Sequence, residues 1–181
     1  MSLLDWLGLS PPERSRAAGP SRPGAGDTDT VRRIVSELER LDPPRARFLA
    51  AFAYVLSRVA AADLHITEEE TTAMVDIVRR LGHLPEEQAV LVVAIAKSQN
   101  RLFGSTENFL VTREFREIAS DEQREELLDC LFAVSAADDS ISGSEEAQIR
   151  QIASELGFRH EEFVKARLAY SHKRSVLKSD R

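Results

Sequence analysis

The ten residues Ala61-Ala62-Asp63-Leu64-His65-Ile66-Thr67-Glu68-Glu69-Glu70 return 75 positions later as Ala136-Ala137-Asp138-Asp139-Ser140-Ile141-Ser142-Gly143-Ser144-Glu145, with five identities. Five more identities extend the match to 27 residues: Ile77, Leu81, Gly82, Glu86 and Glu87 correspond to Ile152, Leu156, Gly157, Glu161 and Glu162. Ten identities in 27 residues exceed the number expected by chance between two unrelated helical segments. The unit has the signals of a helix, an acidic turn, a capped helix, a glycine stop and another helix. It predicts a pseudo-twofold domain that can bring two acidic turns together.

Apolar residues recur at helical spacing throughout the chain. Met74, Ile77, Val78 and Leu81, for example, follow the i, i+3, i+4, i+7 pattern of a buried helix face. Strand signals are absent, so we predict an all-α orthogonal bundle of seven to eight helices that holds all eight phenylalanines. Eight helices are expected. The first four run through Leu41, where Pro43-Pro44 ends the helix, then to Asp63, then to a stop at Gly82, and then from Pro85, where the apolar run 89–96 suggests a central, buried helix. The last four cover 107–119, the segment after the capping signature Ser120–Gln123, a helix ended at Gly157, and a helix from about Arg159 to Lys173.

The two ends of the chain differ in composition from this helical domain. Residues 1–28 contain four of the seven prolines and half of the glycines, which is typical of a flexible linker. Within it, the apolar residues 3–9 carry Trp6, the only tryptophan, and are either a fraying terminus or a tethered peptide for a partner or a membrane surface. We therefore expect a helical domain at 29–173 and a basic tail at 174–181.

Composition narrows the function classes. A net charge of −6 lacks the strong basic field of most nucleic-acid binders, so nucleic acid is not an expected partner. Cys130 is the only cysteine, which fits a reduced compartment, and it lies in an apolar helical run without a histidine at helical spacing. No signal peptide or membrane-length apolar run is present in the sequence. We expect a cytoplasmic, soluble protein.

The repeated acidic turn has the pattern Asp-x-x-Ile-[Ser/Thr]-x-x-Glu. In each copy the hydroxyl residue and the glutamate, Thr67 with Glu70 and Ser142 with Glu145, form the signature of a capping box at a helix N-terminus. Capping does not require the aspartates, and an aspartate at a helix C-terminal end is electrostatically unfavourable. The aspartates at 63 and 138 thus call for a partner: a basic side chain, a backbone N–H group or a cation.

A divalent cation is one candidate, because Ca²⁺ and Mg²⁺ prefer carboxylate oxygens. The spacing imitates the second half of an EF-hand loop, but the positions of its first half hold Val59 and Ala61, or Val134 and Ala136, which offer no side-chain ligand. A metal would therefore need ligands from both copies or many waters. The alternative is that the turns are caps with solvated side chains, and His65 is either an extra ligand or a solvated turn residue.

The paired motif, followed by an apolar helix and Leu-Gly, resembles the TerB-like superfamily over about residues 30–173. This superfamily includes bacterial tellurite-resistance proteins and the N-terminal domain of the membrane co-chaperone DjlA. The resemblance implies an all-helical fold with a metal site at two acidic motifs, which correspond here to Asp63, Glu70, Asp138 and Glu145. The family usually has glycine after each aspartate, where this chain has Leu64 and Asp139; leucine is poorly suited to a positive-φ turn.

Three functions follow from these observations. The first is a non-enzymatic TerB-like module that binds a divalent cation, Ca or Mg, a partner protein, or both; a role in tellurite or stress resistance is what the resemblance implies. The second is a metal-free protein-interaction scaffold of the co-chaperone type, whose acidic turns dock a basic partner. The third, a carboxylate-metal hydrolase, needs an open metal position and a general base, and the sequence offers few polar residues for such a pocket.

Overall fold

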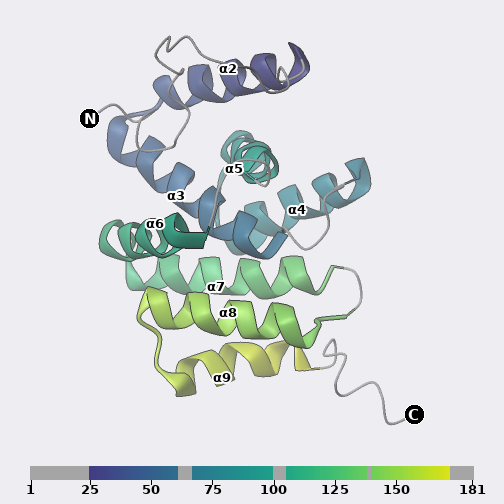
Figure 1. The fold of residues 1–181 in the computed structure, drawn as a ribbon, viewed down its shortest axis with the longest axis vertical. Helices are drawn as coiled ribbons and strands as arrows, with labels where there is room; N and C mark the ends of the chain where they lie inside the picture. The colour runs from purple at the N-terminus through teal and green to yellow at the C-terminus, as the bar shows by residue number, and fades with distance from the viewer. Residues whose placement is uncertain (1–24, 61–66, 100–104, 138–139, 172–181) are drawn as a thin grey trace, which may run out of the picture.

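The computed structural model describes residues 25–60, 67–99, 105–137 and 140–171 (Figure 1). These residues form eight α-helices and no β-strand, which confirms the predicted all-α bundle. The helices are α2 (Ala25–Glu39), α3 (Pro43–Ala60), α4 (Glu68–Leu81), α5 (Glu86–Gln99), α6 (Ser105–Ile118), α7 (Asp121–Ser135), α8 (Gly143–Leu156) and α9 (His160–Ala169).

Helix α3 is the centre of the bundle. It packs against α2, α5, α6, α7 and α8, and its alanines and large apolar side chains are buried on every side. A helix that is apolar all round belongs in a core. The apolar run 89–96 had suggested a central, buried helix. Most of this run is buried, although Val90 is half exposed, and α5 packs against α2, α3 and α4, whereas α3 contacts five helices.

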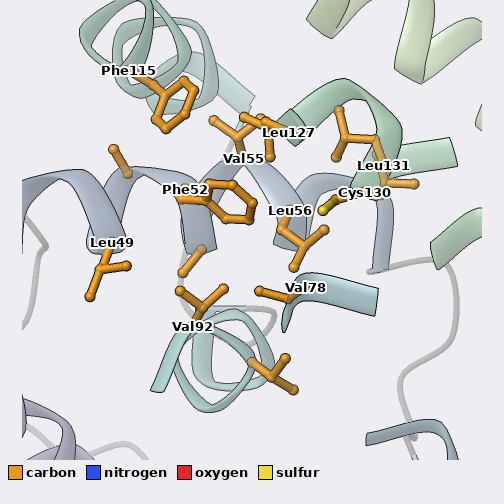
Figure 2. Packing of buried hydrophobic residues seen from close by; sticks show 14 of the residues in the cluster. Leu49, Phe52, Val55, Leu56, Val78, Val92, Phe115, Leu127, Cys130 and Leu131 are labelled. Carbon is orange, nitrogen blue, oxygen red and sulfur yellow. The ribbon is translucent and has the colours of Figure 1, made fainter. Parts of the chain in front are cut away.

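The core is built around aromatic rings that join helices distant in sequence. Phe48 and Phe52 on α3 meet Phe115 of α6, with ring centroids 5.3 and 5.9 Å from Phe115. Figure 2 shows Phe52 beside α7 residues such as Leu127 and facing Val92 of α5. Full burial of each large apolar side chain contributes about 1.5–3 kcal/mol relative to exposure, so this cluster fixes the positions of α3, α5, α6 and α7.

Two helix ends differ from the prediction. Helix α2 ends at Glu39, and the two prolines open α3 instead of stopping α2. Proline is favoured in the first turn, where its missing N–H would lack a partner anyway. The Asp42 carboxylate accepts a hydrogen bond from the Arg45 N–H at 3.1 Å and so caps the start of α3. Helix α9 ends at Ala169, short of the predicted Lys173, which lies outside the described residues.

The end of α9 is fixed by its contact with α7. Tyr170 stacks on Phe132 with ring centroids 5.4 Å apart, and its hydroxyl donates to the Asp129 carbonyl oxygen at 3.3 Å. Burial, with the nearby Asp129 carboxylate as a smaller cause, raises the pKa of Tyr170 to about 12. The hydroxyl therefore remains a donor at neutral pH.

Candidate functional site

The repeated acidic motif begins two helices of 14 residues, α4 and α8, with the same local geometry. At α4, Thr67 Oγ1 accepts from the Glu70 N–H at 3.1 Å, and the Thr67 N–H donates to Glu70 Oε2 at 2.6 Å. At α8, Ser142 Oγ accepts from the Glu145 N–H at 3.2 Å, and the Ser142 N–H donates to Glu145 Oε2 at 2.8 Å. Both predicted capping boxes are confirmed.

Each capping box orients a carboxylate while using only one of its oxygens. The second oxygen, Oε1 of Glu70 and of Glu145, has no hydrogen-bond partner among the described residues. The hydrogen bond from the Thr67 N–H is the largest cause that holds the pKa of Glu70 below its usual range, and the Lys97 ammonium adds to this effect. Glu70 is therefore ionised at neutral pH, as a cation ligand must be.

The other two predicted ligands, Asp63 and Asp138, lie outside the described residues, as do Leu64, His65 and Asp139. Helices α4 and α8 both pack against α7. Within the parts of the chain that are described, no group of three or more Asp, Glu, His or Cys side chains is placed to hold a metal. The described residues thus contribute one oriented carboxylate from each motif.

A buried ion pair that was not predicted from the sequence joins α3, α6 and α8. Arg58 and Glu155 are both less than one-tenth exposed, and Arg58 Nη1 donates to Glu155 Oε2 at 2.5 Å and to Thr112 Oγ1 at 2.6 Å. Gln151 Nε2 adds a hydrogen bond to Glu155 Oε1 at 3.0 Å. The only local signal was an arginine in the apolar helix α3; its partners are 54 and 97 residues away along the chain.

Comparison with protein families settles the relationship of the chain. The family model for tellurite resistance protein TerB matches residues 48–168. The chain belongs to the TerB family. The matched region runs from α3 into α9 and includes both capped helices, whereas α2 precedes it. Searches of curated proteins and of solved structures gave no significant match.

Among the residues with described structure, no helix of this TerB-family chain has the length and apolar character needed to cross a bilayer. The apolar residues 3–9, considered above for a peripheral contact, lie outside those ranges.

Proposed function

We propose that this TerB-family domain is a non-enzymatic binding module that takes a divalent cation at its acidic turns and engages a partner protein, as part of tellurite or stress resistance. The observation that supports it best is the pair of matching capping boxes, which orient Glu70 and Glu145 and leave one oxygen of each without a described partner. Such oxygens suit Ca²⁺ or Mg²⁺. Asp63 and Asp138, seven residues before each glutamate, would complete the ligand set.

A non-enzymatic role is supported by the chemistry of the described polar groups. The Cys130 thiol is buried in the core, and this burial raises its pKa, so it remains a protonated, unreactive thiol. His83 is exposed, and its Nδ1 lies 2.8 Å from Glu126 Oε1. The buried pair Arg58–Glu155 joins three helices through the Arg58 Nη1 atom, which also donates to Thr112, and fits a structural role.

The alternative is a metal-free interaction scaffold of the co-chaperone type. A specific observation favours it: both glutamates already have a structural task, because each accepts the N–H of the first residue of its capping box. In this case the acidic turns would attract a basic partner without a cation.

A melting experiment separates the two proposals. The full chain is melted in chelator and in millimolar Ca²⁺ or Mg²⁺. A cation that binds the folded state adds about 2.7 kcal/mol to the free energy of unfolding at one hundred times its Kd and so raises the melting temperature. Asp138→Asn should abolish this rise, whereas Asp76→Asn, at an exposed aspartate of α4, should retain it. Identical wild-type melts in chelator and cation would reject the cation site and leave the scaffold.

A further inference from the structure

A groove unrelated to the acidic turns lies along α6, α8 and the start of α9. It consists of two adjoining hollows of about 500 and 580 Å³, which share Phe109, Ser154 and Glu155 in their linings. The first extends along α6, and the second extends over α8 to Phe158 and Phe163. This volume is in the range that holds small ligands or a few side chains of a peptide.

The groove exposes apolar surface that the bundle leaves uncovered. Phe109 is 50% exposed and the adjacent Leu110 is 62% exposed, although Phe115 on the same helix is fully buried. Phe158, at the other end of the groove, is half-buried. Single exposed apolar residues are ordinary, but an exposed aromatic beside a hollow is typical of a binding surface.

The rim of the groove has the opposite charge to the protein as a whole. Its charged lining consists of four arginines, Arg113, Arg116, Arg150 and Arg159, against two glutamates, in a chain of net charge −6. One of those glutamates, Glu155, is already neutralised by the buried Arg58. An acidic ligand would therefore meet net positive charge.

Three of the four arginines are available to a ligand. Arg113 and Arg159 make long ion pairs of 3.4 Å with exposed neighbours on their own helix or helix start. Exposed pairs of this kind contribute about 0–1 kcal/mol, so a better-placed carboxylate can replace them. Arg116 has no ion pair or hydrogen bond among the described residues and lies over Gly157 at the end of α8. Arg150 differs, because it pairs with the buried Glu146 at 3.5 Å and lies over the Phe163 ring, 5.6 Å from its centroid.

We propose that this groove binds an acidic peptide segment of a partner protein. An aromatic or aliphatic side chain of the peptide would pack on Phe109 and Phe158, and flanking carboxylates would pair with Arg113, Arg116 and Arg159. Arginine is the residue best suited to such forked carboxylate recognition. The proposal specifies the partner in the interaction role proposed above, but it needs no cation and no residue of the acidic turns.

Charge distinguishes this partner from two other occupants. The chain's own apolar residues 3–9 are followed by residues 10–24, which carry Arg14, Arg16 and Arg22 against one acid, Glu13. This net positive charge is repelled by an arginine rim. A nucleic acid would match the rim but would be repelled by the net negative charge of the whole domain.

A binding titration with the full chain tests the proposal. The probe is a fluorescein-labelled peptide with one phenylalanine flanked by four glutamates, titrated by polarisation in chelator at low and moderate salt. Phe109→Ala and Arg116→Glu should each weaken binding by about tenfold or more, as expected for an aromatic anchor and its charged neighbour. Leu168→Ala, at a leucine of α9 that is 60% exposed and outside the groove, should bind as wild type.

Several outcomes would overturn the groove assignment. They are a wild-type protein that does not bind the peptide at millimolar concentration, groove variants that bind like wild type, and displacement by single-stranded DNA of equal charge as readily as by unlabelled peptide. Tighter binding in Trp6→Ala would show instead that the chain's own segment occupies the groove. Melting verifies each variant's fold; Arg159→Glu, at an exposed arginine, replaces Arg116→Glu if that variant is unstable. Since chelator is present throughout, failure of the cation proposal leaves this result unaffected.

Discussion

The two helices that follow the acidic turns, α4 and α8, begin in the same way and end differently. Helix α4 ends before Gly82, which has φ −83°, and the left-handed residue is the next one, His83, with φ 46°. Helix α8 ends before Gly157, which is itself left-handed, with φ 91°. The same Leu-Gly pair thus stops both helices, but only in the second copy does the glycine adopt the conformation that other residues avoid.

The atoms around Gly82 and Gly157 explain why both positions hold glycine. A Cβ on Gly82 would lie 2.7 Å from the Val78 carbonyl oxygen and 3.2 Å from Phe52 Cζ in the core. The three atoms nearest to a Cβ on Gly157 all belong to the guanidinium of Arg116, at 2.8–3.0 Å, which is the end of a flexible side chain. The first glycine is therefore required for space and the second for its backbone conformation. An identity between two repeats does not imply an identical physical role.

The largest effect is expected for Gly82→Ala. The added methyl group must displace backbone or the Phe52 ring, and overpacking of this kind costs about 1–3 kcal/mol of unfolding free energy. Urea denaturation measures the loss. Gly143→Ala is the matched control, because a Cβ at position 143 meets no atom within 4 Å, and it should leave stability unchanged or raise it slightly. A Gly82 variant as stable as wild type would mean that this end of α4 is not packed as described.

Gly157→Ala should cost somewhat less, about 1–2 kcal/mol, because its penalty is that of a left-handed L-residue. Adding Arg116→Ala should not restore stability; full recovery would show that crowding, not φ, is the cause. In the first copy, His83→Gly should raise the free energy of unfolding only slightly. Glycine adopts the left-handed conformation without strain, but the contact of His83 with Glu126 is lost.

The capping box, which both copies share, should contribute a similar amount to the free energy of unfolding in each. Thr67→Ala and Ser142→Ala should each lower the free energy of unfolding by about 1 kcal/mol, because each leaves a helix N–H without its acceptor. Thr72→Ala is the control, since Thr72 donates to the Glu68 carbonyl within α4 and does not cap it. A loss in only one copy would show that the other helix does not depend on its box.

Local signals account for what could be predicted from the sequence. Apolar periodicity gave all eight helices, and the spacing of Thr67 and Glu70 gave a cap, because both depend on residues within one or two turns. The side of α3 on which α5 lies, the half-exposed Phe109 and the pair Arg58–Glu155 depend on which helices meet. No pattern within a single helix carries that information. For the acidic turns, the sequence motif remains the main evidence.

The smallest effect should come from Glu70→Gln, which separates hydrogen bonding from charge in the first box. The Thr67 N–H holds the pKa of Glu70 down, so this carboxylate stabilises the fold above its unfolded pKa of about 4.3 and loses that contribution as pH falls through the lower folded pKa. Glutamine can keep the box, as Gln123 does where its Oε1 accepts from the Ser120 N–H at 2.9 Å. The variant should therefore be slightly less stable than wild type at neutral pH and equal to it in strong acid, as measured by thermal melts across pH in chelator. Gln123→Glu should introduce the same pH dependence at α7. A difference between Glu70→Gln and wild type that persists unchanged into strong acid would mean that the hydrogen bond, and not the ionised carboxylate, carries the stabilisation.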